Sequence, residues 1–435
     1  MKKLLAILFV CSILIAQSGV VLSAQNTADD IVKLYIGSEY QKVIEILKSK
    51  KADELTAADW YYLGLSYSQI KNIKEAVNAF ERCVKADSTN IAYRLNYSRM
   101  LNQYGRTGDA INNYNMIVEK DSSNVAALYD LGQIYINRKN FMSALPIFKK
   151  LCDFNQSDFL SAYYLALSSY HTAVTPEDTL QVNDLIFRSR LLNFEYIPSA
   201  ELAGVFDLNR NYFGSAYVSY SLLTQLNPAN AEYFYRAGFC FEKLKNYDSA
   251  IGFFNKAIKR DSTVVNYYSH LGYAYFMVGE LDSSLAAYKY AAVLNPEDPA
   301  SYLNLGLVYE KMDSLELAKS AYETALQYYP YSKIVFTAEQ LEAINYRLKN
   351  FEQTQLLCEQ VLTLAPKSMI SLFYSACSLD ALAKTDKAMQ AYKQAAAVLE
   401  KDENYKKELE HVNKRIEEIK AKVKEKNFWE GKINE

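Results

Sequence analysis

The sequence is poor in proline, glycine and histidine. Its 435 residues include 8 prolines, 14 glycines and 3 histidines. Scarce proline and glycine favour long helices joined by short turns. The histidines, His171, His270 and His411, have no Cys, Asp or Glu at metal-ligand spacing, so no metal site and no cofactor are expected. A glycine-rich phosphate loop and a nucleophile-elbow motif are missing as well, and the sequence therefore predicts a protein that is not an enzyme.

An excess of either charge is also missing. The chain carries 48 Lys and Arg against 50 Asp and Glu, a net charge of −2. Proteins that bind nucleic acids carry a basic surface that neutralises phosphates. We therefore expect no nucleic-acid partner. Hydrophobic residues make up 50% of the chain, as in an ordinary folded protein.

Long hydrophobic runs are missing except at the beginning of the chain. Two lysines precede residues 4–16, which are almost all apolar, and small residues follow up to Ala24. This order is typical of a secretory signal peptide, and the run is too short for a membrane-spanning helix, which needs roughly 20 residues. We expect residues 1–24 to be removed, with cleavage after Ser23 as an alternative. The mature chain should then be periplasmic or associated with the cell envelope, without a membrane span. An uncleaved anchor and lipidation of Cys11 are the other interpretations.

Cysteine is sparse and irregularly spaced. After removal of the signal peptide five remain: Cys83, Cys152, Cys240, Cys358 and Cys377. An odd number without regular spacing does not make a disulfide framework. We expect buried thiols, with a bridge between Cys358 and Cys377 as an alternative because their helices should be neighbours.

A repeated pattern is what the sequence does contain. Residues 57–90 place large and small residues at fixed spacings: Trp60, Leu63, Gly64, Tyr67, Ala76 and Phe80. This pattern, W-x₂-L-G-x₂-Y followed by A-x₃-F, resembles the tetratricopeptide repeat (TPR) family. The resemblance implies an all-α fold, an α-α superhelix (TPR solenoid) built from helix-turn-helix repeats.

The pattern recurs along the chain at a step of 34 residues. Small residues follow this step in two series: Gly204, Gly238, Gly272 and Gly306, and Ala76, Ala110 and Ala144. We count about eleven repeats, in which small residues let the two helices of a repeat approach closely. Lys-Asn pairs, for example Lys71-Asn72 and Lys245-Asn246, lie between the two helices, and we expect the asparagine to adopt the left-handed conformation of a tight turn.

Breaks in the step define the predicted domains. Residues 25–158 form an N-terminal TPR lobe and residues 197–399 a C-terminal one. Between them, residues 159–196 are an irregular repeat, four residues too long, with an apparent insertion where its turn should be and a second helix over 180–192. The insertion is either a tolerated loop or a hinge between the lobes. Residues 400–435 are highly charged and predict a C-terminal capping helix, with a partner helix as the alternative.

The resemblance also indicates where a partner would bind. In this family the first helix of each repeat lines the concave face, which implies a groove for proteins or peptides. The residues that the register places there, taken as candidate contacts, are Tyr61, Arg99, Tyr129, Gln133, Tyr235, Phe239, Glu242, Tyr273 and Phe276. Packing of these aromatics against the next repeat is an equally weighted interpretation.

A known way of binding within the family is not predicted here. Some members hold a C-terminal carboxylate with a clamp of Lys, Asn and Arg. The corresponding positions here are occupied by Tyr61, Leu65, Asn96, Ala126 and Asp130, so the clamp is absent.

The sequence as a whole predicts a non-catalytic exported scaffold that mediates protein-protein interactions in the bacterial cell envelope. The alternative is a glycan or small-ligand binding module that uses the tyrosine-rich groove.

Overall fold

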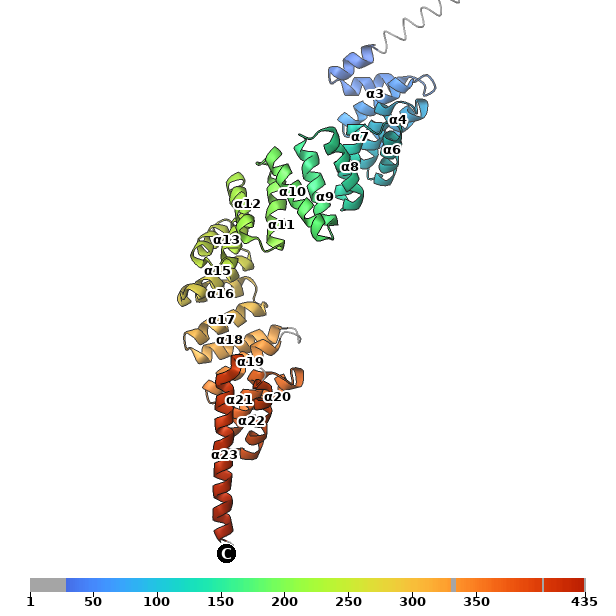
Figure 1. Ribbon diagram of the computed structural model, residues 1–435. Coiled ribbons are helices and arrows are strands. Elements are labelled where there is room, and N and C mark those ends of the chain that lie inside the picture. Colours follow the sequence, from blue (N-terminus) through green and yellow to red (C-terminus); the bar gives the residue numbers. More distant parts are fainter. Residues whose placement is uncertain (1–28, 330–333, 401–402, 434–435) are drawn as a thin grey trace, which may run out of the picture. The chain divides into compact units, whose positions relative to one another are not determined.

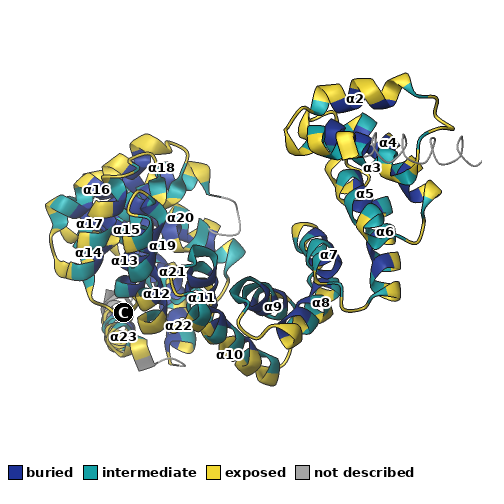
Figure 2. Cartoon of the chain, turned by 90° about the horizontal axis from the view of Figure 1, so that it is seen from above, coloured by how far each residue is buried: buried dark blue, intermediate teal, exposed yellow. Residues whose placement is uncertain are grey.

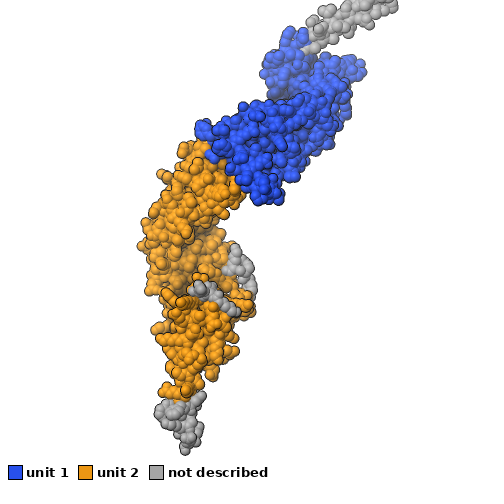
Figure 3. All heavy atoms as spheres, in the orientation of Figure 1, with its two compact units in different colours: residues 1–202 blue, residues 203–435 orange. Residues whose placement is uncertain are grey.

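The computed structural model describes residues 29–329, 334–400 and 403–433, the last of these with side chains up to Glu425 (Figure 1). Within these residues every regular element is a helix and no strand occurs. The chain divides into two compact units between Leu202 and Ala203 (Figure 3). The predicted signal peptide lies outside the described residues.

The first unit consists of consecutive helix pairs that pack on one another. A helix over residues 29–36 precedes the others, which are α2 (Tyr40–Ser49), α3 (Ala57–Gln69), α4 (Ile73–Ala86), α5 (Ile91–Gln103), α6 (Thr107–Lys120), α7 (Val125–Asn137), α8 (Phe141–Phe154), α9 (Phe159–Thr172) and α10 (Pro176–Leu192). The boundary between the units falls within α11 (Ile197–Asn209).

The second unit continues the same alternation. Its remaining helices are α12 (Phe213–Leu226), α13 (Ala231–Lys243), α14 (Tyr247–Ile258), α15 (Val265–Val278), α16 (Leu281–Leu294), α17 (Pro299–Lys311), α18 (Leu315–Tyr328), α19 (Ile334–Arg347), α20 (Phe351–Leu364), α21 (Met369–Ala381), α22 (Thr385–Leu399) and α23 (Lys406–Ile433). The described residues therefore contain eleven helix pairs and a final single helix. This confirms the expected all-α array of repeats.

In most pairs a small residue on the first helix contacts a large residue sixteen positions later on the second. A Cβ atom at Gly64 would lie 3.0 Å from the ring of Phe80, and one at Gly238 would lie 2.8 Å from Phe254. Both phenylalanines are at most 1% exposed. This close approach explains why glycine recurs at the 34-residue step. Figure 2 shows the buried residues along the inner faces of the helices.

The irregular repeat does not contain the expected loop insertion. Three residues, 173–175, join α9 and α10, as many as join α3 and α4. The additional residues extend the helices instead, because α10 has 17 residues where α4 has 14, and α9 has 14 where α3 has 13. α10 begins at Pro176 rather than at Leu180 because Thr175 and Asp178 form a capping box and proline suits the first helical position. A hinge in this repeat stays a prediction.

The turns between paired helices correct the role expected for asparagine. The left-handed residue is the lysine, with φ of 61° at both Lys71 and Lys245. The asparagine after it is the N-cap of the second helix: Asn72 accepts a hydrogen bond from the Glu75 N–H and Asn246 from the Ser249 N–H. The preference of asparagine for capping, rather than its tolerance of positive φ, accounts for the repeated Lys-Asn pair.

We expect Asn246→Ala to lower the free energy of unfolding of the second unit by about 1 kcal/mol, because the helix α14 would lose the acceptor that caps it. Ser314→Ala is a matched control, since Ser314 is the N-cap residue of α18 but its side chain makes no capping hydrogen bond. Urea unfolding followed by circular dichroism measures both. Equal effects of the two changes would contradict the capping role of Asn246.

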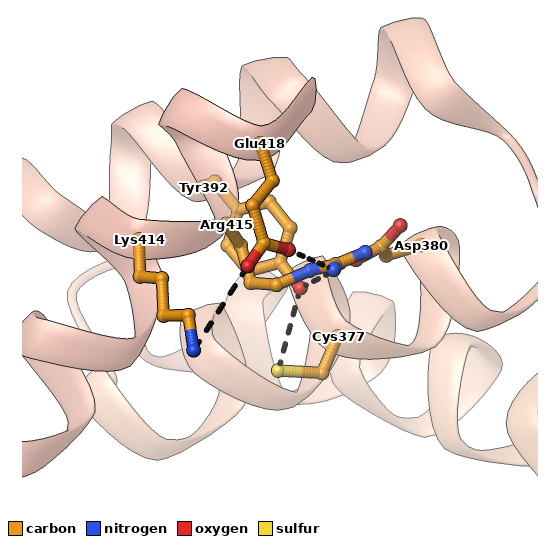
Figure 4. Close-up of polar contacts among 6 residues, drawn as sticks. All are labelled: Cys377, Asp380, Tyr392, Lys414, Arg415 and Glu418. Atoms are coloured by element: carbon orange, nitrogen blue, oxygen red, sulfur yellow. Dashed lines mark hydrogen bonds and ion pairs between the residues drawn. The ribbon is translucent and has the colours of Figure 1, made fainter. Parts of the chain in front are cut away.

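The charged C-terminal helix α23 packs on the last repeat. Val412, Ile416 and Ile419 are buried in a cluster with α21 and α22. The Arg415 guanidinium donates to Asp380 Oδ2 at 2.7 Å (Nη2) and 2.9 Å (Nε), and it also contacts Glu418 (Figure 4). The same Asp380 oxygen accepts a hydrogen bond from the Tyr392 hydroxyl at 3.1 Å. The described part of α23 therefore covers the end of the apolar core, as expected of a capping helix.

The cysteines are buried within the helix pairs. All five described cysteines are free thiols, and no disulfide joins Cys358 to Cys377. Burial raises the pKa of Cys83 and of Cys240 to about 12, so these thiols are neutral and unreactive at physiological pH. They serve as small apolar core residues.

Candidate functional site

The candidate site is a cluster of aromatic and charged side chains on α13 and α15, the first helices of two successive repeats. Tyr235 and Phe239 lie one turn apart on α13, with ring centroids 6.4 Å apart. The His270 ring of α15 lies against both, at 5.4 Å from Tyr235 and 5.6 Å from Phe239. The side chains of α13 and α15 therefore meet, and the predicted contact residues of these two repeats lie on one continuous surface, called the α13–α15 surface below.

A hydrogen bond joins the two helices at this surface, and an ion pair within α13 lies beside it. His270 Nδ1 lies 2.6 Å from Glu242 Oε2, within hydrogen-bond distance. The ammonium group of Lys243 lies 3.5 Å from Glu242 Oε1 and 4.8 Å from the centre of the Phe239 ring. Glu242 is only 5% exposed, so its carboxylate is engaged inside the protein. Glu242 therefore ties neighbouring repeats together, and its contact with a partner stays a prediction.

The other predicted residues of this unit differ in how far they reach the solvent. Tyr273 is 40% exposed, and its ring makes an edge contact with Tyr247. Phe276, in contrast, packs against the buried cluster that contains Tyr288 and Leu305. Tyr235 packs on Phe254 and Tyr267. Tyr273 and the half-buried Phe239 are thus the aromatic residues best placed to touch a partner.

In the first unit the predicted residues make contacts between consecutive first helices. Arg99 of α5 donates from Nε to Asp130 Oδ2 of α7 at 2.7 Å. Tyr61 accepts a hydrogen bond from Asn96 Nδ2 at 3.2 Å, and its ring packs on Phe80 and Tyr93. The Tyr129 ring contacts Phe148 and Tyr164, and Gln133 lies one turn further along α7. These residues therefore make contacts both within their own repeat and with the next one.

The electrostatics of the α13–α15 surface favour neutral phenols and thiols. Burial raises the pKa of Tyr235 to about 12, and burial together with the nearby Glu232 does the same for Tyr267. Burial also keeps the Cys240 thiol protonated. No group of three or more His, Cys, Asp or Glu side chains that could hold a metal ion occurs among the described residues. The arrangement provides stacking surfaces and hydrogen bonds, which are the interactions of a binding surface.

His270 is the residue of this surface that the sequence did not reveal. A lone histidine on a helix is usually a structural polar residue, and nothing in its own repeat marks it otherwise. The signal lies in the repeat register. When positions are counted from the first residue of each first helix, His270 is at position six of α15, and position six faces positions five, nine and twelve of the preceding first helix. Those positions hold Tyr235, Phe239 and Glu242.

Comparison with known families agrees with this geometry. A model described as tetratricopeptide repeat matches residues 60–90, 231–263 and 299–332, and one described as TPR repeat matches residues 278–313. The three segments of the first model each contain a helix pair in which glycine faces a large aromatic ring, whereas residues 278–313 contain α16 and the following α17. The chain contains tetratricopeptide repeats.

Several solved structures resemble this chain at low sequence identity. The crystal structure of MamA is 21% identical, with a TM-score of 0.33, and the alignment covers 42% of this chain and 96% of MamA. YrrB, described as a TPR protein with an unusual peptide-binding site, is 18% identical (TM-score 0.39; 45% and 98% covered). Yeast Tom70 is 15% identical (TM-score 0.37; 91% and 95% covered). No curated protein matches this chain in sequence.

The repeats of this chain indicate a scaffold for protein-protein interaction. No helix of the described residues is long and apolar enough to cross a membrane.

Proposed function

We propose that this protein is an exported scaffold of the bacterial cell envelope that holds a protein partner on the first-helix face of its repeats. The observation that carries the proposal is the α13–α15 surface, which combines the exposed Tyr273 and the half-buried Phe239 with the Glu242–His270 pair. Exposed aromatics next to fixed charges are typical of residues that dominate binding energy at protein interfaces. The signal-like N-terminal residues support export.

The residues of this surface have two different roles in the proposal. Tyr235 and Glu242 are structural, because they pack or pair between α13 and α15 and keep the surface rigid. Phe239 and Tyr273 supply apolar contact area. A rigid platform reduces the conformational entropy lost on binding, which favours affinity for a segment of the partner.

The test is photo-cross-linking in the organism that encodes the protein. We expect a photo-reactive amino acid at position 273 to capture one defined partner, and the same amino acid at position 290 on α16, where Tyr290 is 60% exposed, to capture none. The double change Phe239→Ser with Tyr273→Ser should lower co-purification of that partner at least about tenfold.

The same preparation tests export. The protein should occur in the envelope fraction and begin at Gln25, or at Ala24 with cleavage one residue earlier. Equal capture from positions 273 and 290 would disprove the assignment of the surface, and a cytoplasmic protein that retains Met1 would disprove the proposed export.

A further inference from the structure

The first unit contains a groove that the repeat pattern does not explain. It has a volume of about 770 Å³ and lies where α2, the loop after α2, α3 and α4 meet. Leu47, Leu55, Trp60, Leu63, Tyr67 and Ala79 form its apolar part. None of the predicted contact residues on the first-helix face lines it. The groove is therefore separate from the surface of the proposed function.

A missing helical turn creates the groove. α2 has 10 residues, whereas α4, α6 and α8, its counterparts in the next three repeats, have 14. The residues after α2 do not replace that turn, because they run from Lys50 to Thr56 as a loop. The residue at the position of Trp60 is covered to different extents in other repeats: Leu128 is 2% exposed and Phe234 and Leu372 are 7% exposed, whereas Tyr268 and Tyr302 are half-buried. Trp60 remains half-buried.

Positive charge surrounds this apolar floor. Lys48, Lys50, Arg82 and Lys85 line the groove, against Glu75 and Glu81. Lys85 is paired with Glu81 at 2.7 Å, and Lys50 lies 3.7 Å from Asp59. Lys48 and Arg82 have no ion-pair partner among the described residues. The Arg82 guanidinium lies 4.9 Å from the centre of the Trp60 ring, directly beside the apolar floor.

We propose that this groove binds an acidic peptide segment that places a large apolar side chain on Trp60 and its carboxylates against Lys48 and Arg82. An apolar floor of this size with a few fixed polar groups has the character of a ligand site. Carboxylates next to unpaired guanidinium and ammonium groups gain charge-assisted hydrogen bonds. A bound aliphatic or aromatic side chain replaces the contacts that the missing turn of α2 would make.

The chain allows a direct test, because the sequence contains only two tryptophans, Trp60 and Trp429. With Trp429→Phe in the full chain, tryptophan emission reports on the groove alone. Three synthetic peptides serve as probes: Glu-Glu-Leu-Phe-Glu-Glu, its charge-reversed form Lys-Lys-Leu-Phe-Lys-Lys, and Glu-Glu-Ser-Ser-Glu-Glu, which lacks the apolar anchor. Anisotropy of fluorescein-labelled peptides measures the affinities at low and at physiological salt.

We expect saturable binding of the first peptide with a change in Trp60 emission, and at least tenfold weaker binding of the other two. Arg82→Glu should weaken the first peptide at least tenfold, whereas Lys74→Glu, the same charge change on α4 outside the groove, should change its affinity less than twofold. Lys48→Glu is a second groove variant. It replaces Arg82→Glu in the test if circular dichroism shows that Arg82→Glu has lost helix content.

Three results would overturn the proposal. They are absence of saturable binding, equal affinity for the acidic and the charge-reversed peptides, and equal effects of the groove variants and Lys74→Glu. Because the groove shares no residue with the α13–α15 surface, these results leave the proposed function untouched.

Discussion

Replacing Glu342 with glutamine should stabilise the second unit by about 2–3 kcal/mol at pH 8 and change its stability little at pH 4.5. Glu342 of α19 is fully buried. Its Oε1 accepts a hydrogen bond from the Ser371 hydroxyl at 2.9 Å, but its Oε2 has no N–H or O–H donor among the described residues. Burial raises the pKa of this carboxyl from 4.5 to about 7, and the negative charge of Glu339 adds to the effect.

The direction of the pH dependence follows from this shift. A folded-state pKa above the unfolded value means that the folded chain holds the proton more tightly. The resulting stabilisation is complete below about pH 4.5 and is lost as the pH rises through about 7. The gap between the two values corresponds to about 3 kcal/mol. Glutamine imitates the neutral carboxyl and cannot ionise, so Glu342→Gln should remove this part of the pH dependence.

Urea unfolding at pH 4.5, 6, 7 and 8 measures the effect. Glu352→Gln, which removes an exposed carboxylate from α20, is the matched control and should leave the shape of the profile unchanged. A parallel pH profile for the parent chain and Glu342→Gln would show that another group is responsible.

The position of Glu342 explains why a buried acid occurs here. It lies 36 residues after Gly306 and 34 before Ala376, and so occupies the place of the small residue in its repeat. The residue sixteen positions later, a phenylalanine or tyrosine in most other repeats, is Cys358, which is fully buried and contacts the Glu342 carboxyl. In this repeat the first helix supplies the larger residue and the second helix the smaller one, the reverse of the usual arrangement. The total volume of the two packed side chains is thereby conserved.

The same repeat shows where prediction from the sequence ended. The 34-residue step predicts the close contacts of Gly64, Gly238 and Gly306, because a small residue is needed where the first helix lies against a buried ring. Applied to the tenth repeat, that step leads to Gln340, two residues before the buried position. The sequence does show that residues 333–366 have drifted by two residues, but the repeat pattern gives no reason to expect a charged residue at the buried position, so Glu342 was not identified.

The candidate site was predicted only in part, for a related reason. The register identifies which residues share a face, and this placed Tyr235 and Phe239 correctly together on α13. It does not determine whether a side chain on that face points to solvent or against the next repeat. That outcome depends on partners such as His270 and Tyr267, which come from the following first helix and fix Glu242 and Tyr235 in the interior. The groove beside Trp60 depends on the length of α2, which no motif encodes.

Adding a single methyl group at Gly306 should lower the free energy of unfolding of the second unit by about 1–3 kcal/mol, because the pair α17–α18 has no room for it. A Cβ atom there would lie 2.3 Å from Tyr322 Cε1 and 2.5 Å from Cδ1. The ring cannot move aside easily. Tyr322 is fully buried, and its hydroxyl donates to Glu310 Oε2 at 3.1 Å, while Arg347 of the next repeat also binds Glu310.

Gly252→Ala is the matched control for Gly306→Ala. Gly252 also lies within a helix, α14, but a Cβ atom there would have no neighbour within 4 Å. Alanine at that position should stabilise the helix by about 0.5–1 kcal/mol, because glycine is the poorer helix former. The two substitutions are chemically identical, so the opposite signs expected in urea unfolding isolate the steric effect of Tyr322.

A double change separates the clash from other effects of alanine. The chain already contains an Ala–Val pair at this spacing, Ala166 and Val182, both buried. Gly306→Ala should therefore cost at least about 1 kcal/mol less in a Tyr322→Val background than in the parent chain, because the smaller side chain leaves room for the added methyl group. An equal cost in both backgrounds would mean that Gly306 is required by its backbone rather than by the ring. Gly306 lies inside α17 without a positive φ, so the steric explanation is the one that we expect to hold.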